Sequence, residues 1–391
     1  MTTPVRTIRI RGFRSALDIT LTPGPLTALV GEAGSGKSNL LFAIWKLLDP
    51  GAPPLEAPDT TIGSVGPIRL EADLARGRSI SLAAHPEGAR EERTGTPPDV
   101  LFLPAAERGA GLVPAGAVTS DEIRAALADS PSPALALMLL IEGWLHSKRR
   151  GLFLMVEEPE LFLRPHAQRA LYRLLREFAT QGNQVVYSTH AATFLNVARL
   201  NELALVDRAP SGETTVRRPE PLPETEVFRA LNEFDAERSE LLLARAALLV
   251  EGRTEKLVFP FFFRALGYDA DLEGISIIEC GGKPNIPVIA QICNLTRIPY
   301  LVIHDRDAAP GRRPIASERA VNEAIAQVAG RERTIELARD FEWVAHLHGH
   351  RHKPERAMNW FAVNRSAVEI PKQLGDAVER VVSLARQRSV T

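Results

Sequence analysis

A glycine-rich loop near the N-terminus has the residue types and the spacing that bind phosphate. Residues 31–38 read Gly-Glu-Ala-Gly-Ser-Gly-Lys-Ser, and they lie between an apolar run and the start of a helical pattern. In such a loop the backbone N–H groups face phosphate oxygens, Lys37 reaches the β- and γ-phosphates, and Ser38 can ligate Mg²⁺. The sequence therefore predicts a nucleotide site formed by Gly31, Gly34, Ser35, Gly36, Lys37, Ser38 and Asn39.

Two adjacent carboxylates and a histidine follow later apolar runs. Glu157 and Glu158 come directly after residues 152–156, and His190 follows residues 184–187 and a Ser-Thr pair. Because ligands of open parallel sheets bind at the carboxyl ends of the strands, we expect these side chains near the phosphate loop. There Glu157 would ligate Mg²⁺, Glu158 would orient or deprotonate the attacking water, and His190 would donate a hydrogen bond to the γ-phosphate. Taken singly, such acids often only terminate strands.

Four further acids lie in the second half of the chain. Glu251 follows an apolar run and Glu255 begins the next helical stretch, whereas Asp305 and Asp307 follow another apolar run. Strand-end carboxylates bind hard divalent cations, and such ions can activate water and stabilise the leaving oxygen in phosphodiester cleavage. Between them, residues 281–283 read Gly-Gly-Lys and offer a lysine to a phosphate. Each acid pair alone is also explained by helix capping.

The elements that position these residues follow from the apolar periodicity. Residues 152–156 and 184–187 are predicted buried strands, and they alternate with predicted helices at 131–146 and 165–179. This alternation indicates a parallel sheet. The segment 53–98 is rich in Pro, Gly and Arg, and its alternating stretches predict a peripheral hairpin.

A second α/β pattern follows a proline-rich stretch near residue 220. Its predicted strands are 246–250, 275–278 and 300–303, separated by helical stretches. We therefore expect a nucleotide-binding domain at 1–220, a helical linker at 221–243 and a second α/β domain at 244–391.

Composition narrows the class of protein. The 391 residues carry a net charge of −1, so contact with a polyanion such as DNA requires local basic patches. We expect no membrane contact, because no apolar run is long enough to cross a bilayer. Only Cys280 and Cys293 are present, which together with the lack of an export signal predicts a cytoplasmic protein with both cysteines in the core.

The motifs of the first half resemble the ABC-type ATPase heads of the RecF and OLD (overcoming lysogenization defect) groups. The resemblance lies in the loop 31–38, in Glu-Glu-Pro-Glu at 157–160 with Pro165, and in Ser-Thr-His at 188–190. It implies an ATP site in which His190 is the switch residue and two heads enclose ATP through a signature serine. The sequence departs from these groups at 129–133, where Asp-Ser-Pro-Ser-Pro stands in place of a Ser-Gly-rich turn. Ser130 or Ser132 could contact phosphate or serve only as a helix N-cap.

The motifs of the second half resemble the Toprim domain of topoisomerases, primases and OLD nucleases. They occur in the family's order, with Glu-Gly-x-x-Glu at 251–255, then Gly-Gly-Lys, then Asp-x-Asp at 305–307. The resemblance implies that Glu251, Asp305 and Asp307 hold metal and that Glu255 supports them. The combination with an ABC head narrows the resemblance to the OLD type. The expected fold is thus an ABC/RecF-like P-loop ATPase head followed by a Toprim α/β domain with a parallel sheet.

Residues further along extend this resemblance. Glu342 resembles an additional metal ligand and Lys353 a phosphate-neutralising residue of OLD nucleases. His346, His348, His350 and His352 alternate, so on a strand they could bind a transition metal, although exposure beside a phosphate-binding surface explains them as well.

The leading hypothesis is ATP-regulated, Mg²⁺- or Mn²⁺-dependent nicking or cleavage of DNA, in phage defence or DNA repair. We expect a homodimer or a higher homo-oligomer, or assembly with a partner protein, although OLD proteins usually carry a dimerisation insert for which this shorter chain offers only short segments. The alternative is a nucleotide-switched sensor or scaffold that binds DNA or protein without cutting. A RecF-like repair ATPase fits the head but leaves the second set of acids unexplained.

Overall fold

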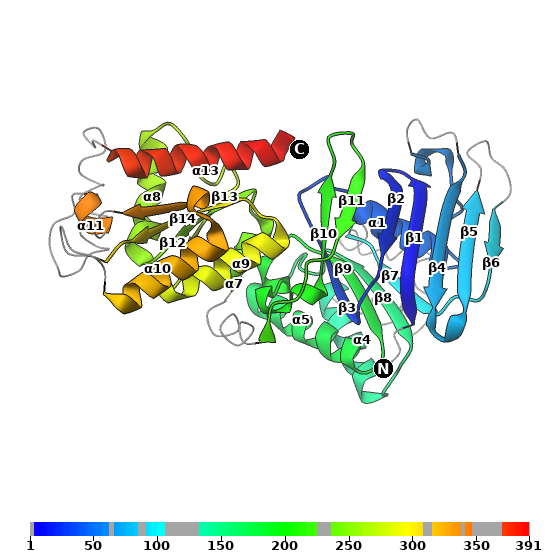
Figure 1. The fold of residues 1–391 in the computed structure, drawn as a ribbon. Coiled ribbons are helices and arrows are strands. Elements are labelled where there is room, and N and C mark those ends of the chain that lie inside the picture. The colour runs from blue at the N-terminus through cyan, green and yellow to red at the C-terminus, as the bar shows by residue number, and fades with distance from the viewer. Residues whose placement is uncertain are drawn as a thin grey trace. The chain divides into compact units, whose positions relative to one another are not determined.

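The structure of the protein is a computed structural model of the 391-residue chain, shown in Figure 1. It describes residues 4–61, 66–84, 91–105, 133–224, 236–307, 315–337, 341–345 and 370–390, without the side chains of 133–136, 197–198, 236–237, 342–343 and 389–390. The chain divides into two compact units, Met1–Pro219 and Glu220–Thr391. The first unit has two sheets and the second has one, and each unit has its own hydrophobic core.

A six-stranded sheet in the first unit carries the predicted nucleotide residues. Its strand order is β11-β10-β3-β9-β8-β7, and all neighbours are parallel except β10 and β11. The strands are β3 (Leu26–Val30), β7 (Asp99–Leu103), β8 (Leu152–Glu157), β9 (Gln184–Ser188), β10 (Leu203–Arg208) and β11 (Thr214–Arg217). Every residue of β3, β8 and β9 is buried, as expected for parallel strands covered on both faces.

A second, antiparallel sheet lies in the same unit, in the order β2-β1-β4-β5-β6. Its strands are β1 (Val5–Phe13), β2 (Ala16–Leu21), β4 (Ile68–Leu74), β5 (Ser79–Ala84) and β6 (Glu92–Thr94). The predicted hairpin within 53–98 is therefore present as β4 and β5, but its peripheral placement is wrong. Strand β4 pairs with β1, and its alternate residues Ile68, Leu70, Ala72 and Leu74 are buried in the core.

Helix α1 (Lys37–Leu48) joins the two sheets of the first unit. It contacts β1 and β4 of the antiparallel sheet as well as β8 and β9 of the parallel sheet. This explains its composition, because Leu40, Leu41, Ile44 and Leu48 are fully buried and no face of the helix is consistently polar. The other described helices of the unit are α4 (Pro133–His146) and α5 (Pro165–Thr180), which pack on each other.

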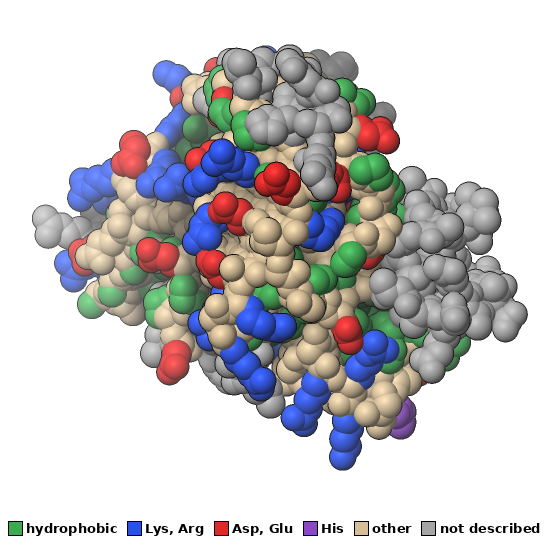
Figure 2. Space-filling view, turned by 90° about the vertical axis from the view of Figure 1, so that its right-hand side faces the viewer, with side chains coloured by type: hydrophobic (Ala, Val, Ile, Leu, Met, Phe, Trp, Pro, Cys, Tyr) green, Lys and Arg blue, Asp and Glu red, His purple; other side chains and the backbone are tan. Residues whose placement is uncertain are grey.

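The exposed face of the antiparallel sheet carries both signs of charge. Arg9 pairs with Asp73, and Arg11 pairs with Asp18. Figure 2 looks onto the β5 and β6 side, where Lys and Arg side chains are interspersed with Asp and Glu side chains. Such exposed pairs contribute little to stability, at most about 1 kcal/mol each.

The second unit is a parallel sheet with helices on both faces. The strand order is β13-β12-β14-β15, formed by β12 (Ala246–Val250), β13 (Ile275–Glu279), β14 (Tyr300–Asp305) and β15 (Thr334–Leu337). The helices are α7 (Ala236–Ser239), α8 (Arg253–Ala265), α9 (Ile286–Thr296), α10 (Ala316–Ala329), α11 (Phe341–Val344) and α13 (Lys372–Val390). Helices α8 and α13 share a core with the sheet, and α9 packs with α10.

The predicted α/β class with parallel sheets is confirmed in both units. Both cysteines are fully buried, and burial raises the pKa of each thiol above its ordinary range. Among the helices of the described ranges, none is long and apolar enough to cross a membrane. Short 3-10 helices lie at Ala57–Asp59, Ala75–Gly77, Ala192–Phe194, Val197–Glu202, Glu240–Leu243, Lys283–Asn285 and Arg331–Arg333.

Candidate functional site

The phosphate loop connects β3 to α1 and depends on glycine at two close contacts. A Cβ atom at Gly31 would lie 1.9 Å from the carbonyl oxygen of Val206. At Gly36, where φ is +108°, a Cβ atom would lie 2.0 Å from Thr214 Oγ1. Because strands β10 and β11 pack this tightly against the loop, only glycine fits these positions.

The side chains of Lys37 and Ser35 are buried within the loop. Lys37 is 5% exposed, and its Nζ donates to the carbonyl oxygens of Gly31 at 2.9 Å and Glu32 at 2.8 Å. Burial lowers the pKa of Lys37, and the charges of Glu158 and Glu160 oppose that shift. The Oγ atom of Ser35 is buried and has no hydrogen-bond partner within the part of the chain that the structure describes. A phosphate oxygen would supply that partner, so the loop fits a nucleotide.

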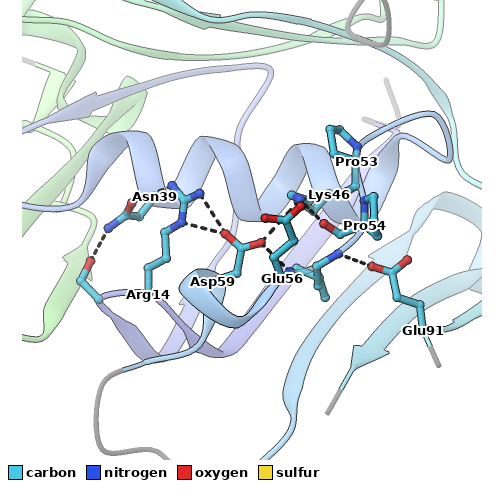
Figure 3. A network of polar contacts seen from close by, with 10 residues as sticks. Arg14, Asn39, Lys46, Pro53, Pro54, Glu56, Asp59 and Glu91 are labelled. Atoms are coloured by element: carbon cyan, nitrogen blue, oxygen red, sulfur yellow. Dashed lines mark hydrogen bonds and ion pairs between the residues drawn. The ribbon is translucent and has the colours of Figure 1, made fainter. Parts of the chain in front are cut away.

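The predicted residues that follow the loop differ in their surroundings. Ser38 is exposed at the start of α1. Asn39 instead enters a polar network, in which its Nδ2 donates to Ser15 Oγ at 2.8 Å and its Oδ1 accepts from Arg14 Nη1 at 3.4 Å (Figure 3). Arg14 in turn forms an ion pair with Asp59 at 2.9 Å. The structure thus gives Asn39 protein partners beside the phosphate loop.

The carboxyl ends of β8 and β9 bring Glu158 and His190 together. The Glu158 N–H donates to the carbonyl oxygen of Ser188 at 2.9 Å, and Glu158 Oε1 lies 3.9 Å from His190 Nε2. Burial and then the charge of Lys37 lower the pKa of His190, so the neutral imidazole is favoured at pH 7. Glu157 is 7% exposed and its Oε2 accepts the Ala105 N–H at 2.9 Å. These three side chains and Lys37 form one site at the sheet edge.

The acids of the second unit meet at the carboxyl ends of two adjacent strands. Glu251 follows β12, and Asp305 ends β14, which pairs with β12 in parallel. The Asp305 N–H donates to Glu251 Oε2 at 3.4 Å. Glu255 lies in the first turn of α8 and is 7% exposed, and Asp307 follows β14 in a left-handed conformation with φ +54°.

A buried lysine supplies positive charge to this acid cluster. Lys283 follows β13, its side chain is 4% exposed, and its Nζ lies 2.8 Å from Asp307 Oδ2 and 3.4 Å from Glu318 Oε2. Glu318 was not predicted from the sequence, although an acid in the first turn of the helix after β14 was a usable signal. Burial, followed by the charge of Asp307, raises the pKa of Glu251, and Lys283 opposes this shift.

The cluster has the donor chemistry for a hard cation but not a closed ligand set. Carboxylate oxygens suit Mg²⁺ or Mn²⁺. Across the described ranges, however, no three His, Cys, Asp or Glu side chains are grouped closely enough to hold a metal ion. The Glu342 side chain, Lys353, the histidines at 346–352, and Ser130 and Ser132 lie outside the described residues.

Family models match residues of both units, and the match in the first unit covers Glu157, Glu158 and His190 but not the loop 31–38. A family model described as "Overcoming lysogenization defect protein-like, TOPRIM domain" matches residues 242–307. A second model, an AAA domain, matches residues 132–196. The chain carries an OLD-like Toprim domain and an AAA-type ATPase domain. The resemblance to the OLD family is therefore confirmed.

Two OLD nucleases are among the similar proteins. The OLD nuclease of Thermus scotoductus is 37% identical over 162 residues, which are 40% of this chain and 31% of that protein. The Old nuclease of Escherichia phage P2 is 27% identical over 167 residues, which are 41% of this chain and 28% of that protein. The matched part thus spans about a third of these relatives.

Two solved structures similar to parts of the chain are an OLD C-terminal region and an SMC head domain. The C-terminal region of the Burkholderia pseudomallei OLD protein has a TM-score of 0.26 at 18% identity, covering 38% of this chain and 99% of that one. The SMC head domain from Thermotoga maritima has a TM-score of 0.39 at 16% identity, covering 56% of this chain and 99% of that one.

Proposed function

We propose that the chain is a DNA endonuclease that requires a divalent metal and is regulated by its ATP state. The observation that carries this proposal is the contact between Glu251 and Asp305 at the carboxyl ends of adjacent parallel strands of the OLD-like Toprim domain, with Asp307 two residues beyond Asp305. Carboxylates placed this way suit phosphodiester cleavage, and the separate phosphate loop provides a means of control.

The nucleotide site of the first unit supplies this control. The loop from Gly31 to Ser38 would surround the phosphates, and Ser38 with Glu157 would hold Mg²⁺. Glu158 lies where it can orient or deprotonate a water, with the neutral His190 imidazole 3.9 Å away as a hydrogen-bond donor. ATP binding and hydrolysis at this site would shift the chain between states, in a homodimer or higher homo-oligomer.

At the second site Mg²⁺ or Mn²⁺ would be held by Glu251, Asp305 and Asp307, with Glu255 and Glu342 in support. The bound metal would lower the pKa of a water and stabilise the leaving oxygen. Lys283 lies beside Asp307 and can place a positive charge next to a scissile phosphate.

Nicking of supercoiled plasmid DNA tests the proposal. The purified chain is incubated with Mg²⁺ or Mn²⁺, with and without ATP, and the wild type is expected to nick. Asp305→Ala and Glu251→Ala should abolish nicking while ATP hydrolysis survives. Glu323→Ala removes an exposed acid of α10 and is the control that should still nick. Undiminished nicking by the Asp305 variant would refute the assignment.

A nucleotide-switched scaffold that binds DNA without cutting is the second candidate function. It is favoured by the contact of Lys283 with Asp307, which supplies a protein cation where a metal would bind. Titration calorimetry with Mn²⁺ separates the two, because a nuclease should bind the ion in an Asp305-dependent manner and a scaffold should not.

A further inference from the structure

Two loops of the first unit carry the groups assigned above to ATP hydrolysis. Glu158 lies in the loop after β8, in a left-handed conformation with φ +48°, and His190 lies in the loop after β9. The paired strands β8 and β9 bring the two loops side by side, and contacts between the loops then orient the Glu158 carboxylate relative to the His190 imidazole.

Glu160 provides one such contact. Its Oε1 accepts the backbone N–H of His190 at 2.7 Å. The second oxygen, Oε2, is buried and has no hydrogen-bond partner within the described ranges. The carboxylate is thus directed at the loop that carries His190.

Gln168 provides a second contact between the same loops. Its Nε2 donates to the carbonyl oxygen of Leu163 at 3.1 Å and that of Glu160 at 3.4 Å, both in the loop after β8. Its Oε1 accepts from Thr193 Oγ1 at 2.6 Å, three residues beyond His190. The loop after β8 is therefore tied to the loop after β9 at His190 and, through Gln168, at Thr193.

We propose that Glu160 is a positioning residue for ATP hydrolysis, which fixes the backbone at His190 so that the imidazole faces Glu158 and the terminal phosphate. This inference rests on the proposed ATPase function. Glu160 acts through the backbone of His190 and not on the nucleotide itself. Its role needs a hydrogen-bond acceptor at Oε1 and not a negative charge, and burial already raises the pKa of Glu160.

Three variants test the inference. Glu160→Ala removes the acceptor, whereas Glu160→Gln keeps a carbonyl oxygen at the same place. Glu202→Ala is the matched control, because Glu202 is also a largely buried carboxylate of this unit but contacts Tyr172 and Arg176 instead of the nucleotide loops. All three are made in the full chain.

The kinetic readout separates positioning from binding and from general destabilisation. Glu160→Ala should lower kcat for ATP hydrolysis by about 10- to 100-fold, because a misplaced catalytic group costs rates of this order. The Kd for a fluorescent ATP analogue should change by less than about threefold, since the phosphate loop is intact. Glu160→Gln and Glu202→Ala should keep kcat near the wild-type value.

Hydrogen exchange gives a readout that does not depend on activity. The His190 amide should exchange faster in Glu160→Ala than in the wild type, and Glu160→Gln should restore its protection. A wild type that hydrolyses no ATP would contradict the proposed function, and the exchange result would then still decide whether Glu160 fixes His190. Equal kcat values for wild type and Glu160→Ala, or unchanged exchange at His190, would overturn the inference.

Discussion

Replacing Lys283 with methionine removes the positive charge from the acid cluster of the second unit while nearly preserving side-chain volume. The lysine side chain is 4% exposed and contacts Asp307 and Glu318, and its charge also lowers the pKa of Glu251. In Lys283→Met, the negative charges of Asp307, Glu318 and Glu251 therefore repel one another without the neutralising charge of the lysine. We expect the folded unit to be destabilised in the absence of divalent metal.

The size of this stability loss depends on how deeply Lys283 and its two carboxylate partners are buried. Removing one member of a fully buried pair costs about 3–5 kcal/mol, and an exposed pair contributes at most about 1 kcal/mol. Here the lysine is buried but the Asp307 and Glu318 side chains are 40% and 33% exposed. An intermediate cost of about 2 kcal/mol corresponds to a Tm lowered by roughly 4–8 °C for a domain of this size.

Divalent cations should reverse much of this loss. A cation that binds the carboxylates replaces the missing charge, and in the variant it does not compete with Lys283 for Asp307. At tenfold excess over its Kd, a ligand stabilises a protein by about 1.4 kcal/mol. We expect Mn²⁺ to raise the Tm of Lys283→Met by several degrees more than it raises the Tm of the wild type.

The assay is thermal unfolding by calorimetry in chelator and in a Mn²⁺ series. Lys46→Met is the matched control, because Lys46 is also buried and lies 3.5 Å from Asp59, in a unit where no acid cluster is proposed to bind metal without nucleotide. It should lose stability without recovery by Mn²⁺. A Mn²⁺-induced rise in Lys283→Met equal to or below that of the wild type would refute the reasoning.

Two further predictions concern the first unit. Gly31→Ala places a Cβ atom 1.9 Å from the Val206 carbonyl oxygen, so it should cost about 2–3 kcal/mol of stability and weaken ATP binding in calorimetry. Gly143→Ala, on an open face of α4, should instead be neutral or stabilising by about 1 kcal/mol, and equal effects of the two would contradict this account. Burial raises the pKa of Glu202 above 4.5, so the folded state loses stability as pH rises through that raised value. The Tm of Glu202→Gln relative to wild type should therefore increase above pH 4.5, and a pH-independent difference would exclude this cause.

Much of the fold could be predicted because buried strands appear in the sequence as short runs of apolar residues. Residues 152–156 and 184–187 became β8 and β9, and the Asp-x-Asp and Glu-Gly-x-x-Glu motifs lie at the ends of β14 and β12. The hairpin formed by β4 and β5 was predicted to be peripheral, and this was wrong. Alternating apolar residues reveal that a strand has one buried face, but they do not reveal which element covers that face. That element is α1, which precedes β4 in the chain and also packs on the parallel sheet.

The sequence by itself determined the phosphate loop, the strand-end acids and their order along the chain, because these depend on local residue types and on the two-residue period of strands. Only the tertiary structure decided which polar groups meet. The contacts of Lys283 with Glu318 and of Glu160 with His190 join residues at least thirty positions apart. No periodicity relates such residues, and their distances are set by how the strands align in the sheet and where the connecting loops turn. The tertiary structure likewise decided that Val206 and Thr214 lie against Gly31 and Gly36 of the phosphate loop.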